Sequence, residues 1–88
     1  MVNVWTIVFT RQAQKDAVKI SKSGLKANVE TLLDILRTDP YQPPCEKLVG
    51  QLSGALSRRI NIKHRLVYQV FDSEKTVKIL RMWTHYDQ

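Results

Sequence analysis

Two arginines in segment 56–70 are the strongest chemical signal in this sequence. Apolar residues there recur at the period-two spacing of a β-hairpin, which predicts one core-facing side made of Leu56, Ile60, Ile62, Leu66, Tyr68 and Val70. Arg59 and Arg65 then project from neighbouring strands onto the opposite face. Two guanidiniums held side by side can each donate parallel hydrogen bonds to a phosphate, so the hairpin predicts an anion site.

Three further residues could turn such a site into one that cleaves RNA: Glu46, His85 and Tyr86. A carboxylate can take the proton of a ribose 2′-hydroxyl, an imidazole can protonate the leaving 5′-oxygen, and guanidiniums can balance the charge of the phosphorane. A tyrosine ring can stack on a splayed base. Taken singly, a solvated glutamate and an incidental histidine are the commoner interpretations.

Two other polar residues of the hairpin fit structural roles better. Arg58 shares the parity of Leu56 and Ile60, which favours a structural ion pair, and His64 falls at the predicted turn, which favours a surface position. No metal or cofactor is expected, because one cysteine and two dispersed histidines do not make a zinc site and the glycines are isolated.

The 88 residues are expected to form a single domain, 1–88, with a formal net charge of +6. This charge predicts a polyanionic partner, either nucleic acid or an acidic protein, with a merely solvated basic surface as the alternative. No apolar run approaches the ~20 residues that span a bilayer, so no membrane association is expected. The lone Cys45 excludes an internal disulfide and suggests a cytoplasmic protein.

The elements that must position these residues follow from periodicity. Residues 4–9 predict a strand that is central or covered by helices, and Thr10 can cap a helix with a stripe of Ala13, Ala17, Val18 and Ile20. A second helix spans Leu25 to Leu36 and ends at Asp39-Pro40. With the hairpin and a last strand from Val77 to Trp83, the order is β-α-α-β-β-β. This order predicts an α+β fold, a curved, largely antiparallel sheet with both helices on one face.

Three motifs carry a family resemblance. They are Leu52-Ser53-Gly54-Ala55-Leu56-Ser57-Arg58-Arg59-Ile60, then His64-Arg65-Leu66-Val67-Tyr68, and finally His85-Tyr86. This combination closely resembles the YoeB/Txe toxins of the RelE superfamily of bacterial toxin–antitoxin modules. The resemblance covers residues 40–86 through specific motifs, and residues 1–39 only through the order of a strand and two helices.

The resemblance implies a RelE-like fold and a ribosome-dependent endoribonuclease that cleaves mRNA in the A site of the 70S ribosome. By this resemblance Glu46 occupies the position of the general base, His85 that of the general acid, and Arg65 that of the residue stabilising the scissile phosphate. Arg59 resembles a further phosphate contact and Tyr86 the aromatic residue that orients the nucleotide. The implied partner is a YefM/Axe-like antitoxin, and some relatives also form homodimers.

Four positions depart from the family pattern. Relatives often carry Pro-Glu-Pro-Leu-Lys around the glutamate, where this chain has Cys45-Glu46-Lys47-Leu48-Val49, so Lys47 is the candidate replacement for the missing basic residue. Trp83 stands where a basic residue commonly precedes the histidine, and Arg81 lies one strand period earlier. Leu56 replaces the usual tryptophan, and Asp87-Gln88 extend the chain beyond Tyr86. These changes bear on substrate positioning and rate rather than on reaction type.

Two other functions remain open on the same fold. A ParE-like toxin would bind DNA gyrase and would need no acid–base pair, which Glu46 with His85 argues against. A degenerate toxin would bind the ribosome or RNA without cleavage, and the changes at Lys47, Val49 and Trp83 keep that alternative open.

Overall fold

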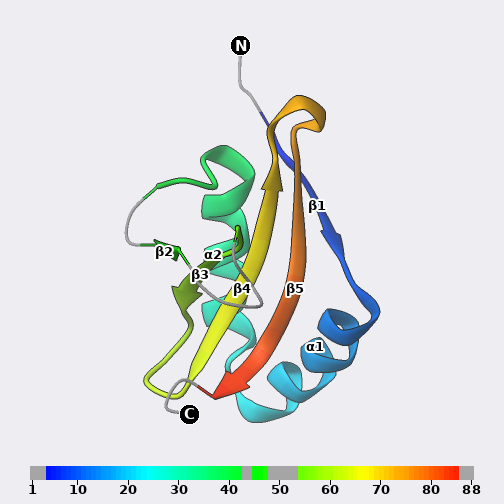
Figure 1. The fold of residues 1–88 in the computed structure, drawn as a ribbon. Coiled ribbons are helices and arrows are strands. Elements are labelled where there is room, and N and C mark those ends of the chain that lie inside the picture. Colours follow the sequence, from blue (N-terminus) through cyan, green and yellow to red (C-terminus); the bar gives the residue numbers. More distant parts are fainter. Residues whose placement is uncertain (1–3, 43–44, 48–53, 86–88) are drawn as a thin grey trace.

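Two helices cover one face of a five-stranded mixed sheet (Figure 1). The computed structural model describes residues 4–42, 45–47 and 54–85, with main chain only for Thr84 and His85. The elements in chain order are β1 (Thr6–Phe9), α1 (Arg11–Ser23), α2 (Lys26–Thr38), β2 (Glu46–Lys47), β3 (Leu56–Arg59), β4 (His64–Phe71), the short 3-10 helix η2 (Asp72–Glu74) and β5 (Thr76–His85). The predicted α+β class and element order are confirmed, and the structure adds β2, a short strand within what the sequence presents as a proline-rich loop.

The sheet has the order β1-β5-β4-β3-β2. Strands β2, β3, β4 and β5 are successively antiparallel, and β1 pairs parallel to β5 at the far edge. The first strand is therefore an edge strand rather than a central one, and its Val8 is exposed. A short apolar run cannot distinguish the two positions, because both require β-forming residues.

Local capping fixes the ends of α1. The Thr10 hydroxyl accepts a hydrogen bond from the Ala13 amide at 3.0 Å and donates one to the Leu80 carbonyl at 3.0 Å. The N-cap therefore also ties the helix to β5. Gly24 ends the helix in the left-handed region, with φ of 84°, where a glycine carries no Cβ penalty.

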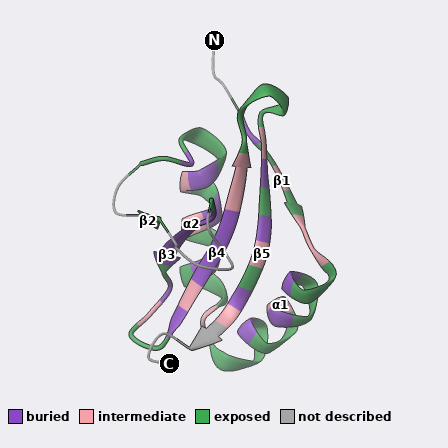
Figure 2. Cartoon of the chain, viewed as in Figure 1, coloured by how far each residue is buried: buried purple, intermediate pink, exposed green. Residues whose placement is uncertain are grey.

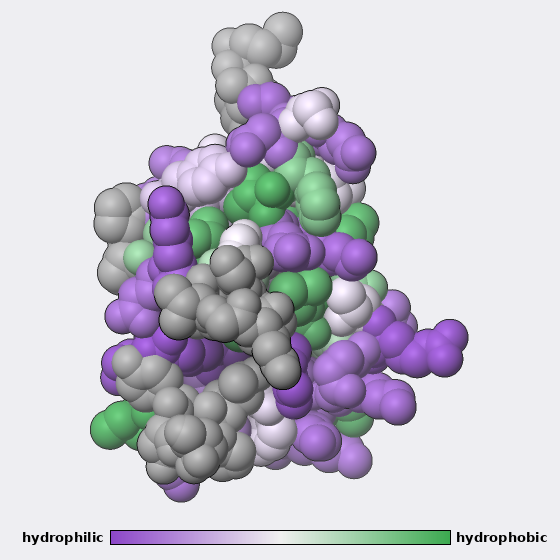
Figure 3. All heavy atoms as spheres, in the orientation of Figure 1, coloured by the Kyte–Doolittle hydropathy of each residue, from purple (hydrophilic) through white to green (hydrophobic). Residues whose placement is uncertain are grey.

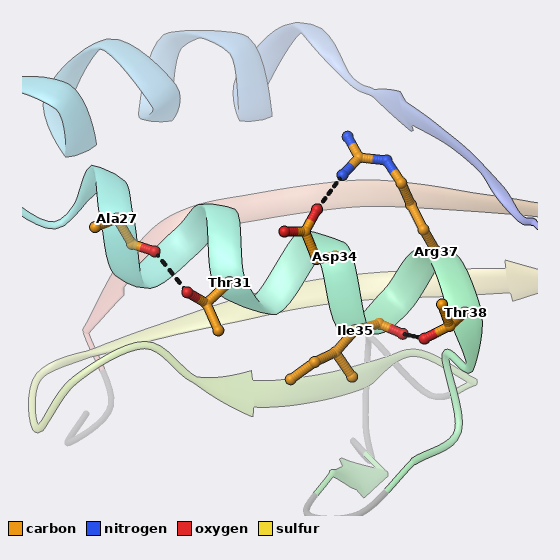
Figure 4. Close-up of polar contacts among 6 residues, drawn as sticks. All are labelled: Ala27, Thr31, Asp34, Ile35, Arg37 and Thr38. Carbon is orange, nitrogen blue, oxygen red and sulfur yellow. Dashed lines mark hydrogen bonds and ion pairs between the residues drawn. The ribbon is translucent and has the colours of Figure 1, made fainter.

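The second helix ends as predicted, with Asp39 as its C-cap before Pro40. Figure 4 shows local contacts on its exposed side: Thr31 to the Ala27 carbonyl, Thr38 to the Ile35 carbonyl, and an ion pair of 2.8 Å between Arg37 and Asp34. Exposed pairs of this kind contribute little to stability. Neither described helix has the length and apolar character needed to cross a membrane.

The core lies between the helices and the sheet (Figure 2). It brings together Ala13 and Ile20 of α1, Val29, Leu33 and Leu36 of α2, and the strand residues Leu56, Leu66, Tyr68, Val77, Ile79 and Met82.

Two residues that the apolar patterns place in this core lie outside it. Val18 is 54% exposed, because the buried face of α1 runs through Ala13, Asp16 and Ile20 and turns past it. Ile62 is 78% exposed, because β3 already ends at Arg59 and strand alternation does not continue into the turn.

Candidate active site

Strand pairing brings a carboxylate to a guanidinium on the sheet face that the helices leave uncovered. Glu46 of β2 pairs with Ser57 of β3, and Arg59 of β3 pairs with Arg65 of β4. Residues of one face alternate along each strand, so Glu46, Ser57 and Arg65 share a face. The Arg65 Nη2 lies 2.9 Å from the Glu46 Oε1, and its Nη1 donates a hydrogen bond of 3.0 Å to the Ser57 hydroxyl.

Ser57 is a site residue that the sequence analysis did not single out. It is 2% exposed and holds one end of the Arg65 guanidinium, while Glu46 holds the other. Ser57 lies two residues before Arg59, so strand alternation already places both side chains on one face. That Ser57 accepts a hydrogen bond from Arg65 could not be predicted, because this contact depends on the register between β3 and β4.

A cavity of about 320 Å³ opens at this pair, lined by Cys45, Glu46, Ser57, Arg58, Arg59 and Arg65. The Arg65 side chain is 11% exposed and the Glu46 side chain 63%, so the guanidinium forms the floor and the carboxylate the rim. Three arginines and one glutamate line the cavity, so its charge suits an anion. On the face of the molecule in Figure 3, hydrophilic residues occupy most of the described surface.

Buried polar contacts hold the chain that leads to Glu46. Arg58 is 4% exposed and donates a hydrogen bond from Nη1 to the Gln42 carbonyl, and the Tyr68 hydroxyl donates one of 2.8 Å to the Pro40 carbonyl. Burial, with the nearby Cys45 thiol, raises the pKa of Tyr68 to about 12, and Arg58 opposes that rise. Arg58 makes a structural contact, as its place on the strand face of Leu56 and Ile60 predicts. Its partner is a main-chain carbonyl, whereas the sequence predicted an ion pair.

His64 is buried, and the prediction of a surface position is wrong. It is the first residue of β4, is 5% exposed, and stacks on the Trp83 ring with centroids 4.0 Å apart and planes 23° from parallel. The turn ends one residue earlier than the sequence suggests, so the ring falls on the strand face that Leu66 also occupies.

The other candidate binding residues fall at different places. Arg59 is exposed and lines the cavity. Lys47 pairs with Leu56, so it points to the face opposite Glu46. Arg81 is exposed on β5 opposite Val67. Neither Lys47 nor Arg81 is among the residues that line the cavity.

His85 is the last residue of β5. The register pairs it with His64, and pairs Thr84 with Arg65, so the main chain of His85 lies one residue beyond the Arg65 position. Its side chain is not described, and Tyr86, Asp87, Gln88 and Val49 lie outside the described residues. Within residues 4–42, 45–47 and 54–85, no group of three or more His, Cys, Asp or Glu residues could hold a metal ion.

A family model shows which family this chain belongs to. The model for the YoeB-like toxin of bacterial type II toxin–antitoxin systems matches residues 9–86. The chain belongs to this family. The toxin YoeB of Streptomyces coelicolor is 35% identical over 75 residues, which cover 81% of this chain and 89% of the relative.

Solved structures agree with the family model. The YoeB/ParE toxin of Agrobacterium tumefaciens superposes with a TM-score of 0.83 at 25% identity, covering 92% of this chain and 99% of that one. The YoeB of Staphylococcus aureus is 32% identical over 93% of this chain and 98% of its own. It superposes with a TM-score of 0.78 as the YoeB-YefM complex and 0.79 as the YoeB dimer.

Proposed function

We propose that this toxin is a ribosome-dependent endoribonuclease that cleaves mRNA in the A site of the 70S ribosome and so stops translation. The observation that carries the proposal is the 2.9 Å contact between Glu46 and Arg65 inside a cavity with two further arginines. An acid–base cleavage of RNA needs a base and a cation at a single phosphodiester. The two groups are close enough for one phosphodiester to touch both.

The proposed reaction begins at the ribose 2′-hydroxyl. Glu46 takes its proton, and the oxygen attacks the adjacent phosphorus and forms a new P–O2′ bond. The P–O5′ bond breaks, and His85 gives a proton to the leaving 5′-oxygen. The products are a 2′,3′-cyclic phosphate and a 5′-hydroxyl, so the step consumes no water and needs no metal.

Arg65 is proposed to bind the scissile phosphate. In the free protein its guanidinium is held by Glu46 and Ser57, and an arriving phosphate would compete with the Glu46 carboxylate for Nη2. That exchange would release the carboxylate toward the 2′-hydroxyl at the moment of binding. Arg59 on the cavity wall supplies a second phosphate contact, and Tyr86 is proposed to orient the nucleotide.

His85 is the proposed general acid because it ends the strand that runs beside Arg65. For this role its ring must reach the 5′-oxygen on the side of the phosphorus away from the attacking 2′-oxygen. Lys47 and Arg81, which lie off the cavity, would act on more distant parts of the RNA, where lysine and arginine serve as backbone phosphate contacts.

An antitoxin is the proposed protein partner. The Staphylococcus aureus relative is solved as a YoeB-YefM complex and as a dimer. A +6 chain with an arginine-lined cavity suits an acidic, partly disordered segment that orders on binding and masks Arg59 and Arg65. We propose a YefM/Axe-like antitoxin of this kind, a homodimer of the free toxin, and a cytoplasmic site of action, since the ribosome is the target.

The proposal is tested by mapping mRNA 5′ ends in a translation reaction with and without the toxin. Cuts confined to translated codons are expected, with Glu46→Gln and His85→Gln each reducing the rate by about 10²–10⁴-fold. Glu74→Gln, a matched change at an exposed glutamate of η2, should cleave like the wild type. Both site variants should still bind the antitoxin.

Two results would replace this function by another. Intact mRNA together with toxin-dependent gyrase cleavage complexes would favour a ParE-like gyrase toxin. Salt-sensitive ribosome binding without any cuts would favour a degenerate toxin that only binds.

A further inference from the structure

A buried carboxylate on α1 contacts the strand that ends at His85. Asp16 is 1% exposed, although it is charged, and it shares the buried face of the helix with Ala13 and Ile20. Its Oδ2 accepts hydrogen bonds from the amides of Met82, at 2.9 Å, and Trp83, at 3.1 Å. Its Oδ1 accepts one of 2.9 Å from the Gln12 side chain.

Asp16 is held in its charged form. Burial acts to raise the pKa of its carboxyl, but the hydrogen bonds from Met82, Gln12 and Trp83 and the charge of Arg81 outweigh burial and lower the pKa below 3.8. A charged carboxylate is a strong acceptor for main-chain amides, and removing it would leave two amides unsatisfied in the core.

The two amides belong to a break in the pairing of β4 with β5. Tyr68 pairs with Ile79, Val67 with Arg81, and Arg65 with Thr84. The register shifts by one residue between Tyr68 and Val67, and by one more between Val67 and Arg65. In the second shift Met82 and Trp83 of β5 stand against the single residue Leu66 of β4, which forms a bulge, and a bulge frees main-chain groups from the ladder.

This bulge decides which residues of β5 lie beside the candidate site. If the pairing of Val67 with Arg81 continued unbroken, Trp83 would face Arg65, and His85 would face Lys63 in the turn. One residue of strand corresponds to roughly 3.3 Å. The bulge therefore draws the main chain of His85 back by that length, to the position opposite His64, the neighbour of Arg65 on β4.

We propose that Asp16 is a positioning residue, whose carboxylate stabilises the bulge at Met82 and Trp83 and thereby sets the register that brings the main chain of His85 opposite His64 and next to Arg65. The inference rests on the proposed function in one respect, the role of His85 as the acid. The side chains of the two bulge residues are also held in place: Met82 is 1% exposed in the core, and the Trp83 ring stacks on His64. The bulge is thus held by its amides and by both of its side chains.

Three variants test the proposal. Asp16→Ala removes the acceptor, Asp16→Asn keeps one oxygen for the two amides, and Asp34→Ala removes an exposed carboxylate of α2 that contacts only Arg37 in the described structure. We expect Asp16→Ala to lower the single-turnover cleavage rate by about 10–100-fold, with KM for programmed ribosomes within about twofold. Asp16→Asn should recover most of that loss, and Asp34→Ala should match the wild type.

A readout that does not depend on activity accompanies the kinetics. In Asp16→Ala the amides of Met82 and Trp83 should exchange with solvent at least about 10-fold faster than in Asp34→Ala, measured by NMR on the free toxin. Asp16→Asn, which preserves volume and an acceptor, keeps the test valid if the alanine variant does not fold.

The outcomes separate the two proposals. A wild type that never cuts mRNA would overturn the proposed function, whereas the exchange rates would still test the bulge. A folded Asp16→Ala with wild-type kcat, or with unchanged exchange at Met82 and Trp83 relative to Asp34→Ala, would overturn the positioning role. If only Asp16→Asn folds, unchanged exchange of these two amides in that variant would overturn it.

Discussion

The hydrogen bond between Arg65 and Ser57 offers a sharp test of how the cavity is organised. Ser57→Ala removes the acceptor of Nη1 at 3.0 Å while leaving the Glu46 contact in place. A hydrogen bond to a charged group contributes about 1.5–3 kcal/mol. Water can enter the cavity and replace part of this hydrogen bond, so we expect the free energy of unfolding to fall by about 1–2 kcal/mol. For a domain of this size that corresponds to a Tm lower by about 5–15 °C.

The same substitution should affect catalysis more than binding. A guanidinium held at one end can rotate toward the Glu46 carboxylate, so it would meet the phosphate in a less favourable orientation. We expect a kcat for mRNA cleavage lower by about 10–100-fold, with a small change in KM. Single-turnover cleavage on programmed ribosomes and thermal unfolding by circular dichroism measure the two effects.

Ser21→Ala is the matched control. Its hydroxyl is exposed and donates only to the Val18 carbonyl of its own helix in the described structure, so the change in the free energy of unfolding should stay within about 0.5 kcal/mol. If Ser57→Ala cleaves at the wild-type rate, Ser57 does not orient Arg65 for catalysis and the reasoning fails.

The remaining predictions concern buried groups away from the cavity. Tyr68→Phe removes the bond to the Pro40 carbonyl and should cost about 1–2 kcal/mol in urea denaturation; an unchanged midpoint would contradict this. Because the folded pKa of Tyr68 is about 12, above its ordinary 10, wild-type stability should fall as pH rises from 10 toward 12, and less so in Tyr68→Phe. The folded pKa of Asp16 lies below 3.8, so its contribution is present above that pH and lost as pH falls through the folded value. In Asp16→Asn the free energy of unfolding should therefore depend less on pH below 3.8 than in the wild type, whereas Asp34→Asn should keep the wild-type dependence.

Local patterns predict most of the fold correctly. Residues 11–23 and 26–38 are helical as their apolar spacing and caps indicate, and the hairpin places Arg59 opposite Arg65. These features depend on residues that are close in sequence, so the spacing of residue types is enough to predict them. Ile62 and His64 lie where β3 has ended and β4 begins, and apolar periodicity says little about such positions. Val18 lies within α1 but off its buried face, which includes the polar Asp16.

The sequence by itself determined the order of the elements, the paired arginines and the family motifs, because each of these is written in residue type and short spacing. Only the tertiary structure decided that Glu46 meets Arg65, that Ser57 holds the guanidinium, and that Asp16 anchors the bulge before His85. Each of these contacts joins distant segments and depends on strand register. Register is set by long-range pairing and by the bulge, which periodicity along one strand does not encode.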